Sequence, residues 1–201
     1  MANHIEETKG RFGERVIIEY DEYTGKTVKK TFYRSNGKTI DYISEFDQDT
    51  GKQIKKIYYK KSFFQHNETI HYIEEFDKDT GKQIKYIDYR SNGTIDCIEE
   101  FDKDTGKQIK YIDCRSNGNI DYISEFDKDT GEEVKTINYR SDGTIDCINE
   151  FDKDTGEEVK TTKHHPNGTI NFIEEFDKET GELVKETYFN PDGTIKEILT
   201  Y

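Results

Sequence analysis

Two glycine-centred turn signals alternate along most of the chain, and their spacing constrains the fold more than any other feature of the sequence. The first signal ends in Thr-Gly, mostly within Asp-x-Asp-Thr-Gly, and it recurs every 25 residues from Gly81 to Gly181. The second places a glycine directly after Asn or Asp, as at Gly93 and Gly118. Glycine adopts the positive φ angles of tight turns, and Asn and Asp hydrogen-bond their own nearby backbone. The sequence therefore predicts short segments separated by tight turns.

The segments between these turns have the length and composition of β-strands. About eight residues separate consecutive turns, which is short for a helix. The chain has 14 Tyr and 12 Phe but only 2 Pro, and aromatic and β-branched residues favour strands. We therefore expect an all-β chain in which residues 14–201 form a seven-unit array of β-hairpins, with about 25 residues per unit. Residues 1–13 are expected to be a polar, poorly ordered segment.

The composition argues against a compact globule. Hydrophobic residues make up 31% and charged residues 36% of the chain, which leaves little apolar surface to offset the conformational entropy lost on folding. Disorder is the first alternative, but disordered chains lack aromatic and β-branched residues. An extended, twisted antiparallel meander, either a single layer or a slowly coiling sheet, accommodates both facts. A β-solenoid is the competing repeat architecture, and the tight hairpin turns disfavour it.

Side-chain pairing across the turns predicts a strand register. We use an uninterrupted count, in which each residue of one strand pairs with one residue of the next, starting from the loop Ser116–Gly118. This count places Tyr122 opposite Ile112 and Ser124 opposite Lys110. Hairpins on both sides of a strand then agree on which residues share a face. A slip of one residue would break this agreement, so we expect a continuous register.

The same register assigns rows of side chains to the two faces. The first face is expected to carry both the phenylalanine row that includes Phe126 and the lysine row that includes Lys110. The second face is expected to be more polar, with a narrow apolar stripe through Ile123. Asp113 would lie opposite Asp121 on this second face. Such like charges are unfavourable, so they are either solvated and screened or bind a cation or a basic partner.

The sequence carries no recurring set of residues for catalysis. No nucleophile–base pair recurs, no zinc-ligand spacing is present, and no glycine-rich phosphate loop opens a helix. The Asp-x-Asp-Thr-Gly turns suggest calcium, but the bidentate Glu of an EF-hand loop is absent and turn chemistry explains the aspartates. We therefore expect no catalytic residue, no metal site and no cofactor.

The three cysteines occupy positions where other repeats carry aromatic residues, as Cys147 does. The simplest interpretation is a small thiol on a packed face, and a diagonal Cys97–Cys114 cross-link is the alternative. An odd number of cysteines is unusual for a secreted disulfide scaffold.

Net charge and hydropathy limit the partners. The net charge of -13, without an offsetting basic stripe, argues against nucleic acid and anionic membrane surfaces. No apolar run reaches the length of a membrane-spanning helix, so no membrane insertion is expected. The N-terminal residues lack the apolar stretch of a signal peptide. The chain is therefore expected to be either cytoplasmic or secreted with its signal removed.

One repeat departs from the regular length. A single glycine spacing is 30 rather than 25 residues, and the additional residues lie near Phe63 and Phe64. Paired aromatic residues on an extended loop are plausible anchors for a partner. We therefore name Phe63, Phe64, Tyr58 and Tyr59 as candidate partner-binding residues. The alternative is that these aromatic side chains fold back and cover the sheet.

The repeat resembles a known but uncharacterised family. The segment Tyr-Arg-Ser-Asn-Gly-Thr-Ile-Asp-Cys-Ile-Glu-Glu-Phe-Asp-Lys-Asp-Thr-Gly-Lys-Gln-Ile-Lys, residues 89–110, resembles short tandem repeats of Mollicutes, notably phytoplasmas. The resemblance covers about residues 14–201 and implies no catalytic residues, because the family has no assigned activity. More distantly, the units are similar to YD repeats, MORN-type repeats and the single-layer sheet of a spirochaete outer surface protein. These similarities concern the fold, which does not imply function.

Repetition without a chemical site suggests a surface for binding. We expect a non-enzymatic repeat protein whose extended sheet contacts another protein, a host protein if the chain is secreted. One alternative is a structural protein that self-associates through its edge strands, which are predicted at residues 15–20 and 195–201. A calcium-dependent binding module is the other alternative.

Overall fold

The computed structural model describes residues 4–11, 13–60 and 69–201. In these ranges the assigned elements are all β-strands. Sixteen strands follow one another in chain order, each antiparallel to its sheet neighbour. The prediction of an all-β antiparallel meander of hairpins is therefore confirmed. Within the described ranges there is no helix of the length and apolarity needed to span a membrane.

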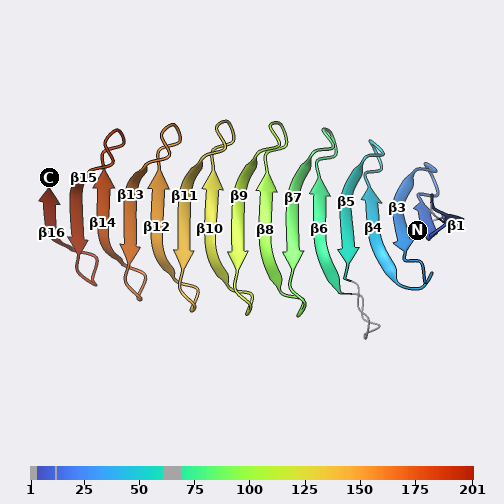
Figure 1. Cartoon of the computed structure of the whole chain (residues 1–201), viewed down its shortest axis with the longest axis horizontal. Helices are drawn as coiled ribbons and strands as arrows, with labels where there is room; N and C mark the ends of the chain where they lie inside the picture. Colours follow the sequence, from blue (N-terminus) through green and yellow to red (C-terminus); the bar gives the residue numbers. More distant parts are fainter. Residues whose placement is uncertain (1–3, 12, 61–68) are drawn as a thin grey trace. The chain divides into compact units, whose positions relative to one another are not determined.

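The chain divides into two compact units. The first comprises Met1–Asp96 with Phe101–Gly106, and the second comprises Cys97–Glu100 with Lys107–Tyr201. Residues of β8 (Ile95–Phe101) belong to both units. In each unit, the described strands contact only the strands next to them in chain order, so each unit is a single layer of strands (Figure 1).

The strands of the first unit are β1 (His4–Lys9), β2 (Arg15–Tyr20), β3 (Thr27–Tyr33), β4 (Ile40–Phe46), β5 (Gln53–Tyr59), β6 (Ile70–Phe76) and β7 (Gln83–Tyr89). The strands of the second unit are β9 (Gln108–Cys114), β10 (Ile120–Phe126), β11 (Glu133–Tyr139), β12 (Ile145–Phe151), β13 (Glu158–His164), β14 (Ile170–Phe176), β15 (Leu183–Phe189) and β16 (Ile195–Thr200). Nearly all are seven residues long, as the spacing of the turns predicts.

Both predicted turn types form as the sequence suggests. In the first, the Gly106 amide donates to the Asp102 carbonyl at 2.8 Å, and Asp102 Oδ1 accepts the Thr105 amide at 2.7 Å. Gly106 has a φ of 78°, a conformation that favours glycine. In the second, the Arg115 amide donates to the Asn119 carbonyl at 2.8 Å, which closes the predicted three-residue loop.

The register inside the hairpins differs from the uninterrupted count because β-bulges insert extra residues. Tyr122 pairs with Asp113 and not with Ile112, since Asp121 is the additional residue of a bulge in β10. The predicted opposition of Asp113 and Asp121 is therefore wrong. Asp121 Oδ1 instead lies 2.6 Å from Arg115 Nη2, so the bulge carries an ion pair in place of a like-charge pair.

The bulges also redistribute the rows between the two faces. Lys110 pairs with Glu125 and not with Ser124. Because successive residues of a strand point to opposite faces, Phe126 lies on the face opposite to Glu125 and Lys110. The prediction that the phenylalanine and lysine rows share a face is therefore wrong. Ile123, which was assigned to the other face, lies on the lysine face.

Acidic and basic residues alternate across the strands of this lysine face and form a charge ladder in each unit. Lys55 Nζ lies 3.2 Å from Glu75, and Lys185 Nζ lies 2.6 Å from Glu175. Opposite charges directly across strands each contribute roughly 0.2–1 kcal/mol, and exposure to water keeps these pairs at the lower end. The paired residues are Glu19, Lys29, Glu45, Lys55, Glu75 and Lys85 in the first unit. In the second unit they are Lys110, Glu125, Lys135, Glu150, Lys160, Glu175 and Lys185.

The most buried row runs through the middle of each unit. Ile43 and Ile73 are 8% and 7% exposed in the first unit, and Ile123 is 9% exposed in the second. Thr162 and Thr187 continue this row in the second unit and are also buried. Much of the small core of each unit therefore lies in this central row, and Val16 and Cys114 are buried outside it.

The N-terminal residues differ from the expectation. Residues 1–13 were expected to be poorly ordered, but residues 4–9 form β1, in which His4 pairs with Tyr20 and Lys9 with Arg15. Strand β2, predicted as an edge, therefore has β1 on one side and β3 on the other. An ion pair between Glu7 and Arg15 at 3.1 Å and a hydrogen bond from Tyr20 to Glu6 at 2.9 Å support this polar strand.

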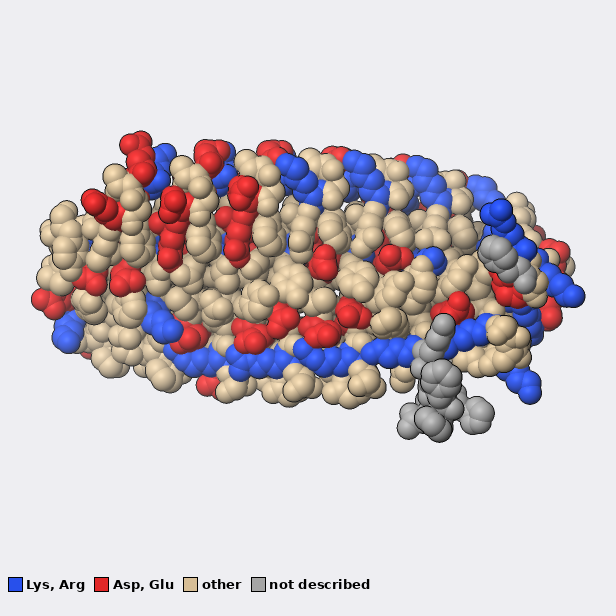
Figure 2. Space-filling view, in the orientation of Figure 1, with Lys and Arg blue, Asp and Glu red and all other residues tan. Residues whose placement is uncertain are grey.

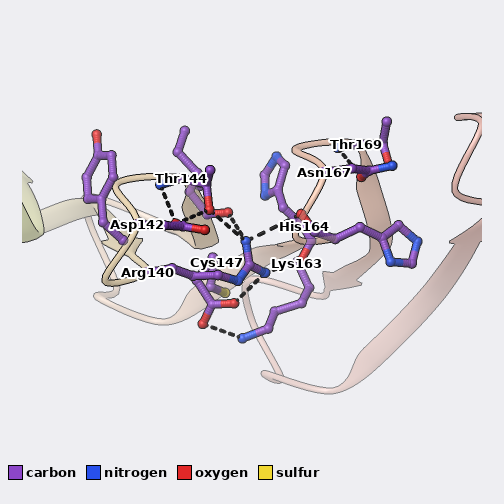
Figure 3. Close-up of polar contacts among 12 residues, drawn as sticks. Arg140, Asp142, Thr144, Cys147, Lys163, His164, Asn167 and Thr169 are labelled. Atoms are coloured by element: carbon purple, nitrogen blue, oxygen red, sulfur yellow. Dashed lines mark hydrogen bonds and ion pairs between the residues drawn. The ribbon is translucent and has the colours of Figure 1, made fainter.

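Arginines at the turn edge hold the bulges in place. Arg140 contacts Asp146 at 2.7 Å and donates to the carbonyls of Ile145 and His164, while Lys163 contacts Asp146 from the other side at 2.8 Å. Figure 2 shows basic side chains in a row beside acidic ones along this turn edge, and Figure 3 shows the Arg140 contacts. The equivalent ion pairs are Arg34–Asp41, Arg90–Asp96 and Arg115–Asp121.

Candidate functional site

Aromatic rings from consecutive strands of the first unit stack into a row, which we call the aromatic ladder. It consists of Phe32, Tyr42, Tyr58 and Tyr72, and successive ring centroids lie 4.2, 5.5 and 4.2 Å apart. Tyr86 extends it diagonally, with its centroid 5.4 Å from that of Tyr72. Offset and tilted rings at such distances attract one another by about 0.5–1.5 kcal/mol per pair. The ladder is therefore a preformed aromatic surface.

The bulged register creates the ladder. Phe32 pairs with Tyr42, Tyr42 with Tyr58, and Tyr58 with Tyr72. The uninterrupted count placed Tyr122, which is at the repeat position of Tyr42 and Tyr72, opposite the aliphatic Ile112, so Phe32, Tyr42 and Tyr72 were not predicted as site residues. The available signal was an aromatic residue that falls alternately at the sixth and the third position of consecutive strands. Asp88 and Cys97 replace it further along the chain.

Two lysines lie on the same face as the ladder. Lys56 Nζ is 4.5 Å from the ring centroid of Tyr42 and 4.4 Å from that of Tyr58. Lys30 Nζ is 5.4 Å from the ring centroid of Phe46. Ammonium groups are attracted to the faces of aromatic rings, by roughly 0.5–1 kcal/mol at exposed sites. The ladder therefore combines aromatic rings with positive charge.

The tyrosines of the ladder remain neutral at physiological pH. Burial raises the pKa of Tyr42 and Tyr58 above the usual value. Burial, helped by a hydrogen bond with Tyr58, raises the pKa of Tyr72 to about 12. Each hydroxyl thus keeps its proton and can both donate and accept hydrogen bonds.

An open hollow of about 490 Å³ lies beside Tyr58 and Tyr72 of the aromatic ladder, at the end of β5. Tyr58 and Tyr59, both predicted as partner-binding residues, line it together. The predicted residues Phe63 and Phe64 lie outside the described residues. The other residues that line the hollow are Arg34, Asp41, Lys60, His71 and Tyr72.

The corresponding face of the second unit carries a cluster of acidic side chains. Glu174 pairs directly with Glu186, and Glu158 on the preceding strand also acts electrostatically on Glu174. Figure 2 shows acidic side chains gathered over the ends of alternate strands in this unit. Cys147, at the repeat position of Tyr42, has its pKa raised by burial. None of the three cysteines forms a disulfide, so the alternative Cys97–Cys114 cross-link is not formed.

The acidic face predicts a stabilising substitution. Burial and repulsion from Glu186 and Glu158 raise the pKa of Glu174 above its usual value of 4.5. The folded state therefore binds this proton more tightly than the unfolded state, and stability falls as the pH rises from 4.5 through the raised pKa. We expect Glu174→Gln to be more stable than the parent at pH 7, with the difference shrinking toward pH 4.5. Urea unfolding at several pH values measures this, and a variant that is less stable at pH 7 would contradict it.

The turn aspartates are occupied by the turns themselves. Asp77 Oδ1 accepts the Thr80 amide at 2.7 Å and the Thr80 hydroxyl at 2.9 Å. These hydrogen bonds lower the pKa of Asp77. In the described part of the chain, no group of three or more His, Cys, Asp or Glu side chains is arranged to hold a metal ion.

Solved structures resemble the chain only weakly. TarM is 20% identical over 54% of this chain, with a TM-score of 0.37, and the chain spans about a fifth (19%) of the TarM chain. TcdB2-TccC3 is 12% identical over 98% of this chain and 12% of its own, with a TM-score of 0.29. A porin-like protein from Bacteroides uniformis is 10% identical over 98% of this chain and 92% of its own, with a TM-score of 0.27. At these values the similarities establish no shared function.

The family comparison is much more extensive. No curated protein matches the chain significantly. A family described as "Protein of unknown function (DUF2963)" matches the chain four times in succession, over residues 13–60, 64–113, 114–163 and 164–201. Because these matches together cover nearly the whole chain, the chain belongs to this family of tandemly repeated domains of unknown function.

Proposed function

We propose that the chain is a non-enzymatic repeat protein that binds another protein through the aromatic ladder of its first unit. The observation that carries this proposal is the row of stacked rings from Phe32 to Tyr72 on a single-layer sheet. Among the described residues, no strand packs over this face, because strands contact only their sheet neighbours. Tyrosines are enriched among the residues that dominate binding energy at protein interfaces.

The energetics of the ladder suit a binding surface. A ring that is already stacked between its neighbours has lost much of its rotational freedom, so binding costs less side-chain entropy. The neutral hydroxyls of Tyr58 and Tyr72 add hydrogen-bonding groups to an apolar surface. The hollow lined by Tyr58 and Tyr59 offers space for a side chain of the partner at one end of the ladder.

A selection of random peptides tests the proposal. Twelve-residue peptides displayed on phage would be selected on the immobilised chain, and the enriched peptides synthesised and titrated. We expect Tyr58→Leu/Tyr72→Leu to weaken their binding at least about tenfold, because truncating central aromatic anchors costs ~2 kcal/mol or more. The matched control is Tyr111→Leu/Tyr122→Leu, which removes the tyrosine pair on the corresponding face of the second unit.

The two double variants separate the outcomes. Peptides that lose affinity for the Tyr58/Tyr72 variant but bind the Tyr111/Tyr122 variant like the parent support the proposal. Equal binding to all three chains would overturn it, as would a selection that enriches no peptide. Circular dichroism and thermal melting of both variants establish that the sheet remains folded.

A further inference from the structure

The aromatic ladder belongs to a row that crosses β2 to β5 without a charged residue. Val16 pairs with Phe32, Phe32 with Tyr42, and Tyr42 with Tyr58, so these four side chains share one face. Val16 is 3% exposed and anchors the β2 end of the row. The row is therefore apolar and aromatic over four consecutive strands.

Over β2 to β5, the neighbouring row on the same face carries only positive charge. Ile18 pairs with Lys30, Lys30 with Ser44, and Ser44 with Lys56. Between β2 and β5 the two lysines are the charged members of this row. Carboxylates flank this stretch on β1, where Glu6 pairs with Ile18, and on β6, where Glu74 pairs with Lys56. Figure 2 accordingly shows mostly uncharged surface over β4 and β5. In a chain of net charge -13, this stretch of the row over β2 to β5 is locally positive.

Ring contacts hold the ammonium groups at this surface. Lys56 Nζ lies within 4.5 Å of the ring centroids of both Tyr42 and Tyr58, and Lys30 Nζ lies 5.4 Å from that of Phe46. Neither lysine side chain is in an ion pair within 4.0 Å among the described residues. Both are therefore available to a carboxylate that approaches from outside the sheet.

The second unit has no lysine at these repeat positions. At the strand position that carries Lys30 and Lys56 in the first unit, the second unit has Tyr111, Thr136, Thr161 and Glu186, and Glu174 and Glu158 add further carboxylates. An acidic ligand would be repelled by the cluster of Glu158, Glu174 and Glu186 and attracted to Lys30 and Lys56. Opposing charge patterns of this kind select one binding site over another.

We propose that the partner segment is acidic and apolar, and that it lies across β2 to β5 with its apolar side chains on the aromatic ladder and its carboxylates near Lys30 and Lys56. This inference rests on the proposed function and names the chemistry of the partner. The net charge alone predicts the reverse preference, for a basic partner. An experiment that compares acidic with basic ligands therefore distinguishes the two expectations.

Synthetic copolymers serve as probes. We expect a random glutamate–tyrosine copolymer to bind the full chain at 50 mM NaCl, and polyglutamate of the same length to bind more weakly. In Lys30→Gln/Lys56→Gln, binding of the glutamate–tyrosine copolymer should fall about tenfold and become less sensitive to salt. The matched control is Lys38→Gln/Lys178→Gln, which removes the same charge from exposed turn positions and should bind like the parent. A lysine–tyrosine copolymer should bind the parent and the Lys30/Lys56 variant equally.

The inference is overturned if the glutamate–tyrosine copolymer does not bind the parent, or if it binds both double-lysine variants with equal affinity. It is also overturned if the peptides selected by phage display depend on Tyr58 and Tyr72 but carry no excess of Asp and Glu. In that last case the proposed function stands, because the ladder still binds a protein segment. If no selected peptide depends on the tyrosines, the proposed function itself has failed.

Discussion

Ile123→Ala is expected to lower the free energy of unfolding by about 2 kcal/mol, because it removes three methyl or methylene groups from the buried central row. Ile123 is 9% exposed and pairs with Ile112 on one side and Ile137 on the other. In a single-layer sheet no second layer can move in to fill the space. The loss is large for a sheet that buries so few apolar side chains.

The chain contains its own control for this substitution. Ile198 occupies the same repeat position in β16 but is 52% exposed. Ile198→Ala removes the same atoms, and we expect it to cost less than about 1 kcal/mol, since little of its surface leaves water on folding. Urea unfolding of both variants measures the difference. Equal losses would show that the central row is not the main apolar core.

Lys135→Glu is expected to destabilise the chain by about 1 kcal/mol at low salt. Lys135 pairs with Glu125 on β10 and with Glu150 on β12, so the substitution replaces two attractive neighbours with two repulsive ones. At 1 M NaCl the loss should shrink markedly, because the screening length falls to about 3 Å.

A substitution with the same change in net charge distinguishes the effect of the charge ladder from that of the overall charge. Lys178 lies in an exposed turn outside the charge ladder, and Lys178→Glu should change stability by no more than about 0.5 kcal/mol. Thermal melting of both variants at low and high salt provides the measurement. If Lys178→Glu lowered stability as much as Lys135→Glu, general charge repulsion would explain the loss and the charge ladder would not.

The turns and strands could be predicted from the sequence because glycine and its Asn, Asp and Thr neighbours act locally. The hydrogen bond between Gly106 and Asp102, for example, involves residues four apart in the chain. The bulges could not be predicted by counting, because a bulge depends on a contact formed only after the strands pair. Arg115 and Asp121 are six residues apart, and their ion pair stabilises the extra residue in β10.

The error in register explains why the candidate site was predicted only in part. Tyr58 and Tyr59 were named because they adjoin the irregular repeat, and both line the hollow. Phe32, Tyr42 and Tyr72 were missed because their pairing depends on the bulges between β3 and β6. A search that allowed one extra residue at each end of a hairpin would have brought these aromatic positions together. The repeated Arg and Asp at the turn edge are the signal for such a search.

The restriction of strand contacts to neighbours in the chain has a kinetic consequence. Within each unit, every strand pairs with a strand that is close to it in sequence. Forming each hairpin therefore requires only a short loop to close, and no distant segment must be found first. A hairpin can pair as soon as both of its strands have left the ribosome, while later repeats are still being synthesised. Each completed hairpin then offers its outer strand as the template on which the following strand pairs.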